Sequence, residues 1–238
     1  MRMVTASGRS RWPIVIGAAA LVVAISGGIA YTATRPTPTP NAAAPSTATA
    51  TPTPTPTSST GTTGIGDDVA PTGCLGGQDR NVNMVLAAQA DAKQTTYGAV
   101  ETATAFYRFI WQYPYPSAED ANTITNEVMT ANTPASYADL AGTYASTEDL
   151  TTGDVEPGTP FHLSTTNGLW LVAQDSTADR VTVNIAAGYV VNGELSPTKV
   201  TAQAFVMVWE GDAWHVEKGE QPDAEKLGAG GNRYTRGC

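Results

Sequence analysis

The sequence predicts an α+β protein: one membrane-spanning helix, a disordered threonine- and proline-rich linker, and a domain of helices packed on a bent antiparallel sheet. Three observations predict this. Residues 12–31 are apolar and uncharged, and a tract of threonine and proline follows them. In the remaining chain, apolar side chains first recur every three or four residues, which is typical of helices, and then every second residue, which is typical of strands. Helices followed by a run of strands indicate an α+β fold.

Residues 12–31 have the length, roughly 20 residues, that a helix needs to cross a bilayer. Three of the four arginines in residues 1–66 precede this stretch. The positive-inside rule therefore places residues 1–11 in the cytoplasm and the rest of the chain outside. The alternative is a signal peptide cleaved near residues 28–30, although its apolar region would be longer than the usual 7–15 residues or so. The predicted location is the cell membrane with an extracellular domain, or the exterior after cleavage.

Residues 32–66 form the predicted linker. Residues 35–63 consist almost entirely of proline, threonine, alanine and serine, and proline occupies every second position of residues 51–57. Such spacing blocks helix and sheet formation and favours an extended polyproline conformation. We therefore predict a semi-rigid spacer, at about 3 Å per residue. Threonine-rich exported tracts are also candidates for O-glycosylation.

Residues 67–238 form the predicted extracellular domain, which carries nine basic side chains against all 22 acidic ones of the chain. So acidic a domain repels polyanions, which argues against nucleic acid as a partner. Its two cysteines, Cys74 and Cys238, lie near its ends. Exported proteins seldom keep free thiols, and domain termini are usually close together. We predict a Cys74–Cys238 disulfide, with intermolecular pairing through Cys238 as the alternative.

Capping residues and apolar spacing predict the helices. They are expected over residues 99–111, from Ser117 to Asn132 and from Ser136 to about Tyr144, with residues 80–92 as a further candidate. Thr95 or Thr96 can cap the first of them. Residues 146–160 are acidic and rich in glycine and proline, so we expect a loop there.

Alternating apolar residues predict the strands over residues 168–174, 180–191, 199–209 and 213–218. Gly188 is a candidate bulge. The pair Asn192-Gly193 is typical of a two-residue hairpin turn, but Pro197 favours a longer connection. The glycine-rich residues 228–231 are interpreted as a flexible tail that leads to Cys238.

The closing hairpin, residues 206–216, has a strand, an acidic glycine-containing turn and a tryptophan-led final strand. It resembles the closing hairpin of the nuclear-transport-factor/ketosteroid-isomerase cone fold, and residues 98–111 are similar to the opening helix of that fold. The resemblance covers about residues 95–220 and implies a cone-like arrangement of the helices and the bent sheet. A cone behind one membrane helix also resembles an assembly component of conjugation and type IV secretion systems in Gram-positive bacteria. That resemblance implies an oligomeric scaffold without catalytic residues.

The polar residues give no strong catalytic pattern. The chain lacks zinc-ligand spacing and a Gly-x-Ser-x-Gly motif. His215 and Glu217 could form an acid–base dyad, and an ordinary surface pair is the plainer interpretation. Asp149, Asp154 and Glu156 could ligate calcium, but a solvated loop is favoured. We predict no enzymatic activity, cofactor or metal.

The aromatic residues are the most informative group. Residues 111–116 read Trp-Gln-Tyr-Pro-Tyr-Pro, which is unusually aromatic for a helix end. Such a segment could line a cone mouth or a partner surface, and core packing is the alternative. The candidate partner or cavity surface comprises Trp111, Tyr113, Tyr115, Trp170, Trp209 and His215.

Together these features favour a membrane-tethered extracellular scaffold or interaction domain with protein partners or a second copy of itself. The resemblance extends this hypothesis to a component of a conjugation or secretion apparatus. Two alternatives stay open. A small-ligand-binding or catalytic cone requires an apolar cavity with an inward-facing acid or histidine. A sensor ectodomain would have only residues 1–11 as its cytoplasmic part.

Overall fold

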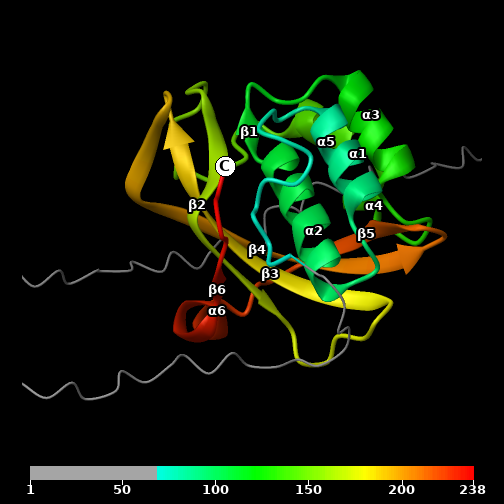
Figure 1. The fold of residues 1–238 in the computed structure, drawn as a ribbon. Helices are drawn as coiled ribbons and strands as arrows, with labels where there is room; N and C mark the ends of the chain where they lie inside the picture. Colours follow the sequence, from blue (N-terminus) through cyan, green and yellow to red (C-terminus); the bar gives the residue numbers. More distant parts are fainter. Residues whose placement is uncertain (1–68) are drawn as a thin grey trace, which may run out of the picture.

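The computed structural model describes residues 69–238. The predicted tail (1–11), membrane helix (12–31) and linker (32–66) lie outside the described residues. Within residues 69–238, no helix is long and apolar enough to span a bilayer. This part of the chain has an α+β fold, in which helices pack on a curled antiparallel sheet (Figure 1).

Most helices precede the long strands along the chain. The helices are α1 (Val82–Asp91), α2 (Thr96–Ile110), α3 (Ala118–Glu127), α4 (Ala135–Ala138), α5 (Leu140–Ser146) and α6 (Ala224–Gly230). The strands are β1 (Gln112–Tyr113), β2 (Phe161–Val172), β3 (Arg180–Val191), β4 (Glu194–Glu210), β5 (Ala213–Glu220) and β6 (Asn232–Arg233). The sheet order is β1-β2-β3-β4-β5, and β6 pairs with β2.

Helix α2 is the centre of the core. Its N-cap is Thr95, whose hydroxyl accepts a hydrogen bond from the Gly98 N–H at 3.0 Å, so the first of the two candidate caps is used. Every helix residue from Gly98 to Ile110 is buried. The rings of Phe106 and Tyr107 pack edge-on against Phe205 of β4, at 5.4 and 5.5 Å between ring centres. The face of the sheet that covers α2 is therefore filled by side chains.

Two predicted helices are shorter or divided. The second one ends at Glu127 instead of Asn132, because the chain then runs beside β5: the Val216 N–H donates to the Val128 carbonyl and the Thr130 N–H to the Val216 carbonyl. The predicted third helix is split into α4 and α5. Asp139 ends the first piece and caps the second, accepting from the Gly142 N–H at 2.8 Å.

The β3–β4 hairpin corrects one prediction and confirms another. Its turn has only two residues, Asn192 and Gly193, both with positive φ (51° and 84°). The longer connection inferred from Pro197 is therefore wrong. Gly188 pairs with Val200, and Val190 pairs with Leu195. Residues 196–199, which include Pro197, therefore have no paired residue on β3. An imide without an N–H is tolerated where no ladder bond forms. The predicted irregularity at Gly188 is confirmed.

Strand β2 begins at Phe161, well before the predicted start at residue 168. Its register with β3 shifts between Ser164 and Leu169, and Asn167 has a φ of 61°. This bulge breaks the alternation on which the sequence prediction relied. Further shifts lie between β3 and β4 and between β4 and β5. Bulges increase local bending, so they help the sheet to curl around α2.

The flexible tail predicted at residues 228–231 is wrong. These residues belong to α6 and the turn into β6. Asp223 caps α6, and Leu227 is buried. The Asp223 N–H donates to the side-chain carbonyl of Asn184, which alternates with the core-facing residues of β3. Helix α6 therefore packs on the outer face of the sheet, opposite α2 (Figure 1).

Candidate partner-binding surface

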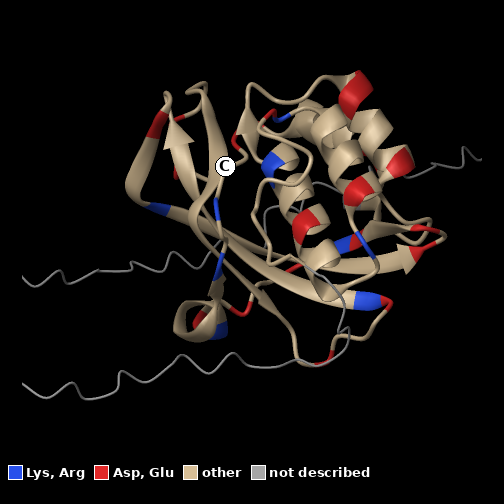
Figure 2. Ribbon diagram, in the orientation of Figure 1, with Lys and Arg blue, Asp and Glu red and all other residues tan. Residues whose placement is uncertain are grey.

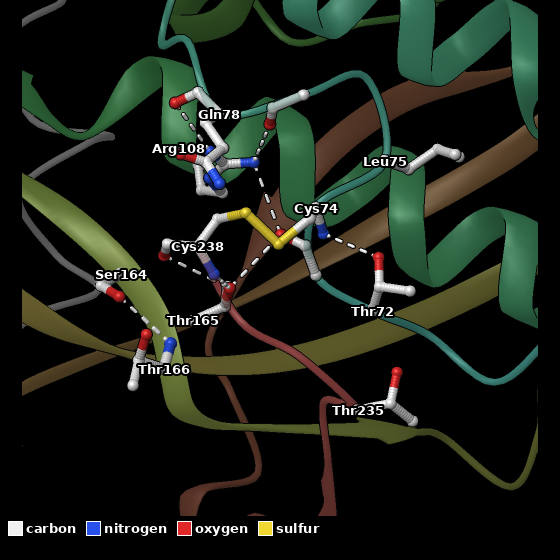
Figure 3. Close-up of a disulfide and its surroundings, with 12 residues drawn as sticks. Thr72, Cys74, Leu75, Gln78, Arg108, Ser164, Thr165, Thr166, Thr235 and Cys238 are labelled. Atoms are coloured by element: carbon white, nitrogen blue, oxygen red, sulfur yellow. Dashed lines mark hydrogen bonds between the residues drawn. A yellow bond between two sulfur atoms is a disulfide. The ribbon is translucent and has the colours of Figure 1, made fainter.

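The predicted Cys74–Cys238 disulfide is present in the structure (Figure 3), with 5.6 Å between the two Cα atoms. Both ends of the described chain run side by side next to it. The Thr235 N–H donates to the Pro71 carbonyl at 2.9 Å, and the Gly237 N–H donates to the Thr72 carbonyl at 2.8 Å. The point at which the linker enters is therefore joined to the last residues of the sequence.

Arg108 of α2 binds the segment that follows Cys74, near the start of the described chain. Its guanidinium donates to the carbonyls of Gly77 at 3.1 Å and Gln78 at 3.2 Å (Figure 3). Burial and the neighbouring Arg80 lower the pKa of Arg108 to about 10. The side chain still carries its charge at neutral pH, and carbonyl oxygens solvate that charge in the interior. These contacts serve structure, because all of them bind backbone groups of the chain itself.

The segment after α2 forms an aromatic stack at one end of the domain. Tyr113 pairs with Phe161 of β2, and its ring meets the Tyr115 ring at a right angle, with 5.3 Å between ring centres. Tyr115 stacks on Tyr144 of α5 at 5.2 Å and donates a hydrogen bond to the Thr147 carbonyl. Tyr113 and Tyr115 are half-buried, so the outer parts of both rings face solvent.

The loop between α5 and β2 closes over this stack and leaves a shallow hollow. Its lining combines aromatic rings, small loop residues and acids: Tyr113, Tyr115, Glu148, Asp149, Leu150, Thr151, Val155, Glu156, Pro157, Gly158, Thr159 and Phe161. The enclosed volume is about 10 Å³, space for one water molecule. The hollow is therefore a surface feature that a side chain or peptide could touch, and it is too small to enclose a metabolite.

Two acids of this hollow form no ion pair with another of the described residues. Glu148 and Glu156 are exposed, and the ion pairs found within residues 69–238 join other residues. Lys199 reaches the same loop but donates to the backbone carbonyl of Asp154. Figure 2 shows acidic residues spread over the helices and connecting loops, with few basic residues between them. The rim of the hollow therefore attracts positive charge.

Asp149, the third acid of the hollow, has a local role. Its carboxylate accepts hydrogen bonds from the N–H and the hydroxyl of Thr151, both at 2.8 Å, and from the Gly153 N–H at 2.6 Å. These bonds hold the turn that follows Asp149. In the described residues, no group of three histidine, cysteine, aspartate or glutamate side chains is placed to hold a metal.

The six aromatic and histidine candidates fall into three places. Trp111 lies at the same end as Tyr113 and Tyr115, but it is 2% exposed and contacts Tyr107 and Tyr189. It therefore belongs to the core and does not contribute to the outer surface.

The other three candidates lie away from the hollow. Trp170 is 7% exposed and meets Tyr97 at the start of α2. Trp209 is half-buried and packs edge-on against Trp214, its cross-strand partner in the last hairpin. His215 follows Trp214 on β5. The structure therefore joins only the candidates of residues 111–116 into one site.

The His215–Glu217 dyad is not formed. Both carboxylate oxygens of Glu217 are bound by the guanidinium of Arg180 on β3. The Glu217 carboxylate is therefore paired with Arg180, and the buried Nδ1 of His215 has no hydrogen-bond partner among residues 69–238. The residues that sequence reasoning missed are Tyr144, Leu150 and Phe161, whose distance from Tyr115 along the chain gives no local signal.

Comparison of the chain with protein-family models, with curated proteins and with solved structures gives no match. The site is therefore defined by its own geometry. A half-exposed tyrosine pair lies beside two acids that form no ion pair in the described part of the chain, on a domain whose interior is filled.

Proposed function

We propose that this chain is a membrane-tethered extracellular scaffold or interaction domain, and that it presents the hollow beside Tyr113 and Tyr115 to a protein partner. The observation that carries the proposal is the combination of two half-exposed tyrosine rings with Glu148 and Glu156, two exposed acids that form no ion pair within residues 69–238. Tyrosine is enriched in binding interfaces because it offers a rigid apolar ring with a polar tip. The acids would select a partner that presents arginine or lysine.

The element order supports the cone-like resemblance and, through it, a role in a conjugation or secretion apparatus. Helices, a short strand and further helices precede four long antiparallel strands that curl around α2. A scaffold in such an apparatus needs interaction surfaces and no internal cavity. The packed interior agrees with this role, since the largest fully buried side chains include Trp214, Tyr107 and Phe205.

A ligand-binding or catalytic cone receives less support. The second hollow, beside Trp111 and Tyr144, also encloses about 10 Å³, which is far below the several hundred cubic ångströms, about 300 or more, of ordinary ligand sites. A sensor role would require a second protein to carry the signal. It therefore also requires a protein partner, and the experiment below tests for that partner.

The proposal is tested by site-specific photo-crosslinking of the full-length chain in intact cells. A photoreactive residue at Tyr115 should give one discrete product heavier than the chain, and the same residue at Asp212, in the β4–β5 turn, should not. Reversing both acids with Glu148→Lys and Glu156→Lys should remove the product. A chain that is retained in the membrane and yields no product at Tyr115, or equal products at both positions, contradicts the proposal.

The membrane tether is tested separately by the intact mass of the chain extracted from membranes. Retention of residues 1–31 supports an anchor. A mature chain that begins near residue 31 supports a secreted binder.

A further inference from the structure

We infer that the hollow beside Tyr113 and Tyr115 is occupied, while no partner is bound, by the chain's own residues 35–40. These residues read Arg-Pro-Thr-Pro-Thr-Pro. The inference rests on the proposed function, because it concerns the same surface, and it adds an internal competitor for the partner. Three independent features carry it: the aromatic rings, the unpaired acids, and the length of chain between the segment and the domain.

The aromatic part of the hollow suits a proline-rich segment. Tyr113 stands perpendicular to Tyr115, and Tyr115 is fixed by its stacking on Tyr144 and by its hydrogen bond to the Thr147 carbonyl. Rigid, partly exposed rings of this kind form the grooves in which polyproline segments dock. A polyproline segment is already extended, so it loses little conformational entropy when it binds.

Charge complementarity favours residues 35–40 over the second proline-rich run, residues 51–57. Arg35 is the only charged side chain between residues 12 and 66, and Glu148 and Glu156 of the hollow have no ion-pair partner within the described residues. The longer run at residues 51–57 consists only of threonine and proline. Residues 35–40 therefore match the acids as well as the rings, whereas residues 51–57 match the rings alone.

The spacing within the segment fits both parts of the hollow at once. A polyproline helix has three residues per turn and rises about 3.1 Å per residue, so in that conformation Arg35 and Pro38 would lie on one face about 9 Å apart. An arginine can then reach the acidic rim while the proline ring lies on a tyrosine.

The chain is long enough to fold back. Residue 69 lies three residues before Thr72, whose hydroxyl donates a hydrogen bond to Glu101 of α2. About 14 Å of helix separates Glu101 from Ile110, the last residue of α2. Residues 41–68 could span on the order of 85 Å in polyproline conformation, and residues 58–66, with three glycines and no proline, favour a change of direction.

Weak affinity is sufficient for this docking. Attachment through a linker of this length gives an effective concentration in the millimolar range, so a dissociation constant of about 1 mM would fill the hollow half of the time. A partner with a stronger cationic segment would displace residues 35–40. Displacement would expose the surface and release the spacer, which would let the domain move away from the bilayer.

The test uses the full-length chain, reconstituted in membranes, with a photoreactive residue at Tyr115. After crosslinking and digestion, mass spectrometry should find Tyr115 joined to residues 35–40 of the same chain. Arg35→Glu should reduce this crosslink by about fivefold, because the roughly tenfold loss of affinity expected for one charge-assisted hydrogen bond lowers an occupancy of one half to about one tenth. Arg35→Lys, which keeps the charge, should retain most of it. Glu156→Lys should abolish it, whereas the matched reversal Asp212→Lys should not.

Three results would overturn the inference: crosslinks to residues 51–57 in place of 35–40, crosslinks to residues 35–40 of another chain in a mixture of isotopically heavy and light protein, or no crosslink to the segment. The same photoreactive position distinguishes failure of this inference from failure of the proposed function. A partner product at Tyr115 without the intrachain product refutes only the self-docking. If both hold, Arg35→Glu should increase the yield of the partner product in cells.

Discussion

Glu101, in the middle of α2, holds Thr72 through two hydrogen bonds to one carboxylate oxygen, one from the Thr72 hydroxyl at 2.8 Å and one from its backbone N–H. The same carboxylate accepts from the N–H groups of Gly73 and Leu75. A single buried side chain therefore organises the segment through which the linker enters the domain. This explains why a carboxylate is tolerated inside a helix that is otherwise packed against the core.

Replacing this carboxylate should destabilise the domain. In Glu101→Gln, one oxygen becomes an NH₂ group that faces N–H donors, so the free energy of unfolding should fall by about 1–3 kcal/mol. Denaturant unfolding of the full-length chain in detergent measures the change. Glu210→Gln, at an exposed position, is the matched control and should stay within about 0.5 kcal/mol of the parent. Equal stability of both variants would show that the carboxylate does not hold the entry segment.

The disulfide should contribute more than any single hydrogen bond. It joins residues 164 positions apart, and a loop of that length restricts the unfolded chain by on the order of 5 kcal/mol in the loop-entropy model. The double variant Cys74→Ser and Cys238→Ser should unfold at a much lower denaturant concentration, as should the parent chain under reducing conditions. An unchanged midpoint in both experiments would contradict this.

Two glycines should respond to alanine in opposite directions. Gly228 lies in α6, and a Cβ there would meet open space, so Gly228→Ala should stabilise by up to about 1 kcal/mol. A Cβ on Gly219 would lie 2.0 Å from the Tyr137 hydroxyl oxygen, so Gly219→Ala should destabilise by about 1–3 kcal/mol. Melting temperatures measure both. A loss of stability in Gly228→Ala would indicate that α6 is not helical in solution.

His162 should make the domain sensitive to acid. Burial, together with Arg80 and Arg108, lowers the pKa of His162 from 6.5 to about 4. Between these values the folded chain binds fewer protons than the unfolded chain, so the free energy of unfolding should fall as the pH falls through this window. His162→Gln should reduce that slope, as measured by urea unfolding at several pH values. Equal slopes in parent and variant would contradict the assignment.

The fold class was predictable because it depends on local periodicity. The helix caps Thr95 and Ser117 and the hairpin turn at Asn192 and Gly193 all lie where short-range signals place them. Errors occurred where a distant contact overrides the local pattern. Residues 128–130 leave the helix because β5 pairs with them, and α6 forms on the outer face of the sheet although its sequence is rich in glycine.

The candidate site was predictable only in part. Residues 111–116 contain three aromatic residues, an unusual density for a helix end, and this segment supplies Tyr113 and Tyr115. The sequence could not distinguish these half-exposed rings from Trp111, which the core buries. It also could not bring Glu148 and Glu156 next to them, because a loop has no periodicity from which its position can be inferred.

By itself, the sequence determined the composition of the chain's parts, the acidic charge of the domain, the change from helices to strands, and the pairing of two cysteines that had few other options. Those properties follow from residue types and short-range spacing. The tertiary structure alone decided which aromatic rings reach solvent, which acids form no ion pair within residues 69–238, and how the two ends of the domain are joined through α2. Those properties depend on contacts between residues far apart in the chain, whose energies emerge only when the core is packed.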